Sequence, residues 1–304
     1  MRIAITGATG LVGTALVPFL EAEGHEVIPL SRGEGRGRRE HRWTPESGLV
    51  DAAALGPLDA LVHLAGESVA ASRWSAEVKA RIRNSRVGPT MALAQTLAAA
   101  PTRAGALISA SAIGIYGDRG DEALTEESER GEGFLADVCE AWEAAAEPAH
   151  AAGIRVVHPR FGIILDARGG ALGTMRKPFS LGLGGRLGSG DQYYSWVGMQ
   201  DVVRALLFAM TQPQLRGPIN VTAPNPVTNA EFTQTLAQVL RRPAVLPVPG
   251  FVLRALVGEM ADAELLASKK VLPASLQQAG FAFVHPHLEE ALRFTLDGVD
   301  NPAV

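Results

Sequence analysis

Three glycines near the start of the chain have the spacing of a turn that holds a phosphate group. The run GATGLVG places glycine at positions 7, 10 and 13, between a short apolar segment and one whose apolar residues repeat at helical spacing. Gly7 allows a sharp turn after the strand. Gly10 removes a Cβ where a pyrophosphate would meet the free N–H groups of the helix, and Gly13 lets the helix pack closely. A strand, this turn and a helix in that order favour a dinucleotide site over a purely structural turn. The residues that we predict to bind the cofactor here are Gly7, Gly10, Leu11, Val12 and Gly13.

The end of the second predicted strand indicates which dinucleotide is bound. Sites that prefer NAD usually place an acidic residue there, which holds the ribose 2′-hydroxyl. This chain has LSRG instead, with Ser31 and Arg32 and no acidic group. Arg32 can pair with a 2′-phosphate and Ser31 can hydrogen-bond to it, so we predict NADP(H) as the cofactor. The alternative is that Arg32 is a solvated loop residue.

The elements that must position these residues alternate between strands and helices. Apolar runs predict strands over 2–6, 25–31, 59–65, 106–110 and 153–161, and helical periodicity predicts helices over 11–23, 75–99 and 134–152. Gly24 is the expected end of the first helix, and Ser75 is the expected N-cap of the second. Strands that are apolar throughout and alternate with helices indicate an α/β fold, a Rossmann-type doubly wound parallel sheet.

The composition changes after residue 169. Glycine and aromatic residues fill GLGGRLGSGDQYYSWVG, which is typical of loops that line a cleft, and further helices are expected over 201–210 and 229–240. We predict an NADP-binding Rossmann domain over 1–165, to which 201–222 returns. The segments 166–200 and 223–304 are predicted to form a smaller α/β cap that binds substrate, including a short C-terminal domain over 247–296.

Several motifs together resemble a known family. GATGLVG, HLAGES, RIRNSRVGPT, SASAIGIYG and GSGDQYYSWV are similar to motifs of the extended short-chain dehydrogenase/reductases. The likeness is greatest to an atypical branch that resembles nucleoside-diphosphate-sugar epimerases and carries a short C-terminal domain of unknown function. The resemblance implies that Leu64, Ala65 and Gly66 border the cofactor, and that Arg86 contacts a phosphate or ribose. Arg86 and its neighbouring arginines are equally consistent with a solvated basic face.

The same resemblance shows where the chain departs from the family. Typical members carry Tyr-x-x-x-Lys on the helix after the fourth strand, and the tyrosine exchanges the substrate's hydroxyl proton during hydride transfer. If Glu143 aligns with a glutamate that often follows this motif, Leu135 and Cys139 stand in place of the tyrosine and the lysine. Neither residue can perform that acid–base chemistry.

Other residues are therefore candidates for handling a proton or binding substrate. Ser109 and Ser111 follow the fourth strand, where ligands bind in such folds, although strand-end capping explains them equally well. Tyr116 supplies a phenol, or packs beside the site. The predicted catalytic residues are Ser111 and Tyr116. The predicted substrate contacts are Tyr193 and Trp196, with core packing as the alternative for both aromatic side chains. Arg160 and Lys177 are candidates for pairing with an anionic substrate.

Composition narrows the class of protein. The chain has 304 residues, 47% of them hydrophobic, with a net charge of −4 and a single cysteine. This balance is typical of a soluble globular protein and gives no reason to expect nucleic acid or membrane as a partner. One cysteine forms no intramolecular disulfide, and no apolar run reaches the ~20 residues of a membrane span, so we expect a cytoplasmic protein. The histidines lack the spacing of a metal site.

The sequence is consistent with two functions. The first is an NADP(H)-binding epimerase or oxidoreductase that acts on a small substrate, free or nucleotide-linked, through a non-standard proton donor. The second is a regulatory or interaction protein that binds NADP(H) and has lost catalysis, which the absent Tyr-x-x-x-Lys favours. The sequence does not specify the substrate or the oligomeric state.

Overall fold

The computed structural model describes residues 1–32, 41–49, 55–100 and 104–300. In this part of the chain, β1 (Arg2–Thr6) lies at the centre of a sheet with the strand order β13-β9-β6-β5-β1-β2-β3-β4, and β7 pairs with β9. The strands are β2 (Glu26–Ser31), β3 (His41–Thr44), β4 (Gly48–Leu49), β5 (Ala60–His63), β6 (Ala106–Ser109), β7 (Ser111–Ala112), β9 (Arg155–Phe161) and β13 (Gly217–Val221). Every pairing is parallel except that between β3 and β4. The predicted Rossmann-type sheet is confirmed.

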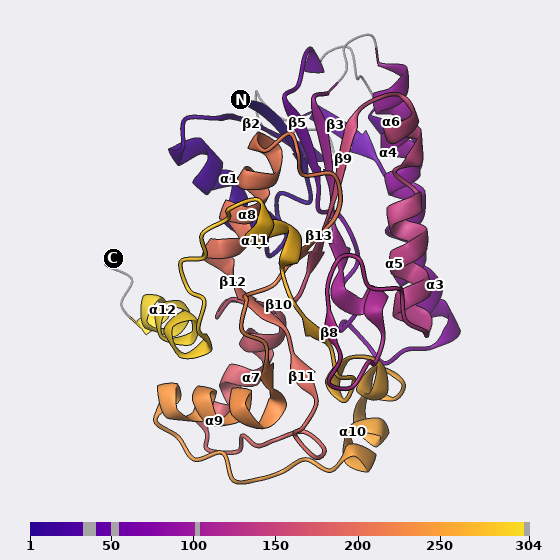
Figure 1. Ribbon diagram of the computed structural model, residues 1–304. Coiled ribbons are helices and arrows are strands. Elements are labelled where there is room, and N and C mark those ends of the chain that lie inside the picture. The colour runs from indigo at the N-terminus through magenta and orange to yellow at the C-terminus, as the bar shows by residue number, and fades with distance from the viewer. Residues whose placement is uncertain (33–40, 50–54, 101–103, 301–304) are drawn as a thin grey trace.

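Helices cover both faces of the sheet (Figure 1). On one face, α1 (Gly13–Ala22) and α8 (Met199–Thr211) bury leucine and valine side chains against Ile3 and Ile5 of β1. On the other face, α4 (Val87–Ala99) and α6 (Glu147–Ala151) pack on Leu61 and Leu107. Burial of apolar side chains on both faces explains why the strands read as continuous apolar runs.

Two predicted helices are each divided in two. The segment 75–99 forms α3 (Ala76–Asn84) and α4, and the segment 134–152 forms α5 (Phe134–Ala144) and α6. A proline stands in the first turn of each second helix, Pro89 in α4 and Pro148 in α6. Proline lacks the N–H that would continue the preceding helix but is tolerated in a first turn. The caps are as predicted: Ser75 Oγ accepts the N–H of Val78 at 3.3 Å, and Gly24 follows α1 with φ of +79°.

A smaller lobe follows the main sheet in sequence. Its helices are α7 (Gly170–Ser180), α9 (Asn229–Leu240), α10 (Gly250–Val257), a π-helical turn (Ala261–Leu265) and α12 (Leu288–Asp300). In contrast, α11 (Ala274–Gln278) packs on β13, and its Leu276 lies in the core of the main sheet. Short strand pairs complete it: β10 (Ile163–Leu165) with β12 (Trp196–Gly198), and β11 (Tyr193–Tyr194) with β14 (Val227–Thr228). Trp196, Phe232 and Leu292 lie in its buried core. The predicted α/β cap is confirmed, while the exact domain boundaries stay a prediction.

The segment Ser268–Leu272 joins the lobe to the main sheet. Its strand β15 (Lys270–Val271) pairs with β8 (Ala123–Leu124). The N–H of Ser268 donates to Asp118 Oδ1 at 3.0 Å, and the N–H of Val271 donates to Ser195 Oγ at 2.8 Å. Asn220 Nδ2, on the edge strand β13, donates to the carbonyl of Leu272 at 2.9 Å. This segment therefore connects three parts of the chain that are distant in sequence.

Candidate functional site

The glycine turn lies where the strand order reverses, between β1 and the neighbouring strands β2 and β5. Gly7 has φ of +72°, a conformation that L side chains rarely adopt. A Cβ on Gly7 would also lie 2.8 Å from the carbonyl carbon of Leu64 and 2.9 Å from the nitrogen of Ala65. Both the turn and the close approach of the chain after β5 therefore require glycine here. Ligands of open α/β sheets bind at this reversal.

The start of α1 provides donors for an anion. A Cβ on Gly13 would lie 2.2 Å from the carbonyl oxygen of Gly7, so the helix begins in direct contact with the turn. The N–H of Gly10 donates to that same oxygen at 2.9 Å. The N–H groups of Leu11, Val12 and Gly13 have no backbone acceptor within the described ranges. Free N–H groups at the start of a ten-residue helix attract negative charge.

Leu11 extends this contact to the smaller lobe. Cβ atoms on Gly169 and Gly170, at the start of α7, would each lie 3.1 Å from the Leu11 side chain. The turn, the chain after β5 and the start of α7 therefore meet at one place.

Arg86 has a structural role in this conformation. Its guanidinium donates to the carbonyls of Glu67 at 2.8 Å and Ile82 at 2.9 Å, and lies 5.0 Å over the ring of Trp142. Burial lowers the pKa of Arg86. The guanidinium thus holds the loop that contains Gly66 against α3 and α5. Contact between Arg86 and a cofactor stays a prediction.

Ser31 and Arg32 end the described part of the chain after β2. Ser31 is the last residue of β2, whose neighbour β1 leads into the glycine turn, and the side chain of Arg32 is exposed. An exposed guanidinium beside the reversal point is available to a bound phosphate. The predicted roles of Ser31 and Arg32 agree with this placement but are not tested by it.

A buried polar network connects both predicted catalytic residues. Ser111 Oγ donates to Glu143 Oε1 at 2.6 Å, and Arg160 binds both oxygens of Glu143 at 2.8 and 2.9 Å. Arg160 also donates to the hydroxyl of Tyr116 at 2.9 Å, which in turn donates to Asn220 Oδ1 at 2.8 Å. Burial on its own would raise the pKa of Glu143, but the hydrogen bonds and charge of Arg160 hold it below its ordinary value. Arg160 is therefore bound internally, and the residue is 7% exposed.

Ser111 and Tyr116 differ in what they can still bind. Tyr116 is fully buried, both sides of its hydroxyl are hydrogen-bonded, and burial raises its pKa. In this conformation Tyr116 belongs to the packing beside the site. Ser111 is also buried, and its hydroxyl is oriented by a carboxylate. Roles of either residue in catalysis stay predictions.

Leu135 and Cys139 lie in apolar surroundings. Leu135 packs with Trp74 and Ile82, and burial raises the pKa of Cys139 to about 12. Gly114 lies against both side chains, since a Cβ there would be 3.3 Å from Leu135 Cβ and 3.8 Å from the sulfur of Cys139. A thiol in this state is protonated and unreactive near neutral pH.

A cavity of about 240 Å³, here called the α5 cavity, adjoins Leu135 at the start of α5. Apolar and glycine residues form part of its wall. The titratable residues that line it are Asp118, Glu132, Glu259 and Asp262, with no lysine or arginine among the described lining residues. Two of these carboxylates are paired with cations from outside the lining, Glu259 with Lys79 and Asp262 with Arg254.

The two predicted substrate aromatics lie in the smaller lobe. Trp196 is fully buried, and its Nε1 donates to the carbonyl of Asn225 at 3.1 Å. The core-packing alternative therefore describes Trp196, whose ring has no exposed face to offer a ligand. Tyr193 is partly buried, and the ammonium of Lys270 lies 4.7 Å from the centre of its ring.

Sequence reasoning missed several buried polar residues of the sheet. His63 Nδ1 lies 2.6 Å from Thr6 Oγ1, and His63 Nε2, Ser109 Oγ and His158 Nδ1 are buried without hydrogen-bond partners. The sequence of β9 indicates such polar residues, because His158 and Arg160 interrupt its apolar run at a spacing of two and so share a face of the sheet. Within the described ranges no His, Cys, Asp or Glu cluster could hold a metal ion, and no helix could cross a membrane.

Comparison with known proteins identifies matches along almost the whole chain. Residues 3–157 match the NAD-dependent epimerase/dehydratase family, and residues 248–295 match a domain of unknown function, DUF1731. Epimerase family protein MT2273 of Mycobacterium tuberculosis is 45% identical over 96% of both chains. Human epimerase family protein SDR39U1 is 36% identical over 96% of this chain and 99% of its own length.

Solved structures show the same similarity. The crystal structure of human SDR39U1 with NADPH superposes with a TM-score of 0.90 at 34% identity, covering 98% of this chain and 99% of the human one. UDP-glucose 4-epimerase of Thermus thermophilus, solved with NAD, has a TM-score of 0.77 at 21% identity over the full length of both chains, which supports the fold alone.

Proposed function

The chain belongs to the NAD-dependent epimerase/dehydratase family, and from this we propose that it is an NADP(H)-binding oxidoreductase or epimerase acting on a small molecule. The observation that carries the proposal is the glycine turn. Side chains at Gly7 and Gly13 would collide with neighbouring backbone, and the N–H groups after Gly10 are free to bind an anion.

These residues fit the adenine and diphosphate side of a dinucleotide. Gly7, Gly10, Leu11, Val12 and Gly13 would hold the diphosphate, with Leu64, Ala65 and Gly66 beside it. Ser31 and Arg32 would bind a 2′-phosphate. NADPH in the human relative's structure supports this choice.

The cofactor, when bound, supplies or accepts a hydride. The chain's own residues must then place the substrate oxygen and handle its proton. We assign that contact to Ser111, because it follows the fourth strand of the sheet and Glu143 fixes the orientation of its hydroxyl. Arg160 holds Glu143 in place by hydrogen bonds, and Arg160 is itself bound to the hydroxyl of Tyr116. Substrate would enter through the α5 cavity, which is lined by Gly114 and Leu135 next to the predicted site.

The cofactor assignment is tested with Arg32→Ala. Loss of one charge-assisted contact to the 2′-phosphate costs roughly 1.5–3 kcal/mol, so we expect NADPH affinity to fall at least tenfold and NADH affinity to stay unchanged. Calorimetric titration of both cofactors measures this. Arg241→Ala, in the smaller lobe, is the matched control. Equal losses for NADPH and NADH would refute the 2′-phosphate role.

The chemistry is tested by screening NADPH oxidation with neutral, cationic and nucleotide-linked carbonyl compounds. For any substrate found, we expect Ser111→Ala to lower kcat by ~10²–10⁴-fold, since a positioned acid–base group contributes that much. Ser109→Ala is the control, because Ser109 Oγ has no partner to lose. Turnover that survives Ser111→Ala would show that another group handles the proton. Tight NADPH binding without turnover of any compound would favour the non-catalytic alternative.

A further inference from the structure

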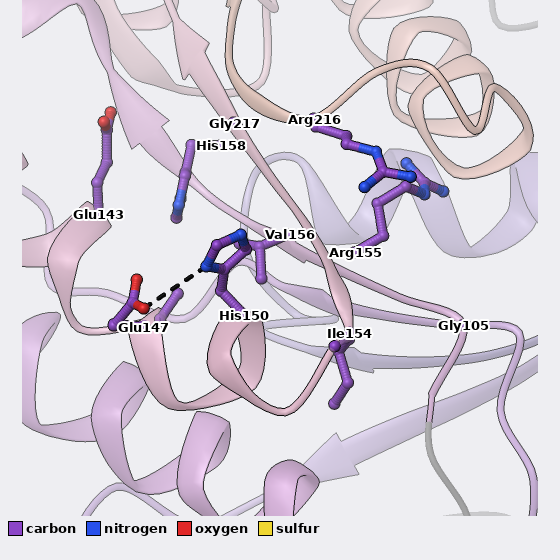
Figure 2. A pocket seen from close by; sticks show the side chains of 12 residues that line it. Gly105, Glu143, Glu147, His150, Ile154, Arg155, Val156, His158, Arg216 and Gly217 are labelled. Atoms are coloured by element: carbon purple, nitrogen blue, oxygen red, sulfur yellow. Dashed lines mark ion pairs between the residues drawn. The ribbon is translucent and has the colours of Figure 1, made fainter.

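A second pocket lies at the opposite edge of the sheet from the glycine turn. It is lined by residues at the amino ends of β6, β9 and β13 and by residues of α5 and α6, and it encloses about 350 Å³ (Figure 2). We call it the amino-edge pocket. That volume is within the range of sites for small organic ligands. Its titratable lining residues are Glu143, Glu147, His150, Arg155, His158 and Arg216.

The two arginines lie together at one end of the pocket (Figure 2). Arg155 donates three hydrogen bonds of 2.8 to 3.0 Å to the carbonyls of Ala209, Met210 and Leu215. Arg216 is exposed and has no hydrogen-bond or ion-pair partner in the described ranges. Burial, and after it the charge of Arg216, lowers the pKa of Arg155. Two adjacent guanidinium groups with no carboxylate between them favour binding of an oxyanion.

Carboxylates lie at the other end, near the α5–α6 junction (Figure 2). Glu143 is neutralised by Arg160, whereas Glu147 is largely exposed and, among the residues that the structure describes, pairs with His150 alone, at 3.5 Å. An ion pair this exposed contributes little and leaves Glu147 available to a ligand cation.

His158 supplies a buried polar group between the two ends. The residue is 8% exposed, and its ring points from β9 toward Glu147 and His150 (Figure 2). Its Nδ1 atom has no hydrogen-bond partner. His158 is also one of the residues that line the pocket, so its ring resonances report on what the pocket holds.

From this arrangement we propose that the amino-edge pocket binds a small zwitterion, with its anionic group at Arg155 and Arg216, its ammonium group at Glu147, and its body beside the ring of His158. A purely anionic ligand would leave its far end against Glu147, and a purely cationic one would meet the arginines. The bipolar lining fits a molecule that carries both charges, such as an amino acid or a short peptide. The proposal does not depend on the cofactor, and it shares Glu143, which also orients Ser111, with the proposed reaction site.

The test uses the full-length chain and four zwitterions of graded length: glycine, β-alanine, γ-aminobutyrate and glycylglycine. Binding is measured by calorimetry and by the ring resonances of His158 and His150 in NMR spectra. We expect saturable binding of at least one probe with a shift at His158. N-acetylglycylglycine, which lacks the ammonium, and glycylglycinamide, which lacks the carboxylate, should each bind roughly tenfold more weakly or worse.

Two exposed residues test the two ends separately. Arg216→Gln and Glu147→Gln should each weaken binding of the best zwitterion by roughly tenfold to a hundredfold. Arg293→Gln, a surface arginine on α12, should leave it unchanged, and melting temperatures check that all three variants fold. The proposal is overturned if no probe binds, if both pocket variants bind like the parent chain, or if N-acetylglycylglycine binds as tightly as glycylglycine.

Discussion

Buried ionisable side chains in the main sheet are each held in a single protonation state. Glu143 is kept charged by Arg160, and removal of either partner would leave an unpaired charge in the interior. His63 and His158 are kept neutral, because burial lowers both of their pKa values. These residues therefore make the stability of the fold depend on pH.

His63 gives a prediction with a defined sign. Burial lowers its pKa from 6.5 to about 4. Between these values the unfolded chain binds a proton that the folded chain excludes. The free energy of unfolding is therefore highest, as far as His63 is concerned, above pH 6.5. It falls by roughly 3 kcal/mol in all as the pH drops toward 4.

His63→Asn should remove that share of the pH dependence while still bonding to Thr6. Urea unfolding of both proteins across this pH range measures it. His158 contributes in the same direction to both proteins, so the difference between them isolates His63. Parallel curves for parent and variant would contradict the assignment.

Local sequence patterns predicted most of the helices and strands that position the glycine turn. Periodicity located β1, β2, β5, β6 and β9 and the helices between them, and Ser75 and Gly24 marked helix ends correctly. The strands β3, β4, β7 and β8 were not predicted, because two to four residues are too few to show a period. The breaks before α4 and α6 were missed because a proline in a first turn leaves the apolar period intact. The glycine turn was predictable because strand, turn and helix are consecutive in the chain.

The contact between the turn and α1 leads to a second stability prediction. A Cβ at Gly13 would lie 2.2 Å from the backbone of Gly7, so Gly13→Ala should cost roughly 1–3 kcal/mol and weaken NADPH binding by displacing the turn. Gly88→Ala is the matched control. Gly88 lies in α4, where a Cβ meets nothing within 4 Å, so alanine there should stabilise the protein by up to about 1 kcal/mol. Chemical unfolding and NADPH titration of both variants measure these effects, and equal stability of the two variants would rule out the close contact.

At the scale of the whole molecule, the sequence could not predict which distant segments meet. Tyr116 bonds to Asn220 across 104 positions, and Asp118 bonds to Ser268 across 150. Neither partner belongs to a local pattern, because periodicity reports the face of an element and not the segment that packs on it. The Ser111–Glu143–Arg160 network could not be predicted for the same reason, because its three residues come from three different elements.

The segment Ser268–Leu272 has a consequence for the order of events during synthesis. A ribosome releases the strands of the main sheet, β1 to β13, before this segment. Until it emerges, Asp118, Ser195 and the amide of Asn220 lack the partners that it supplies. Because Asn220 also holds Tyr116, the network behind Ser111 is completed only after residue 272 has been made. The nascent chain can thus form its glycine turn early, whereas the rest of the proposed site matures only after about 260 further residues have been made.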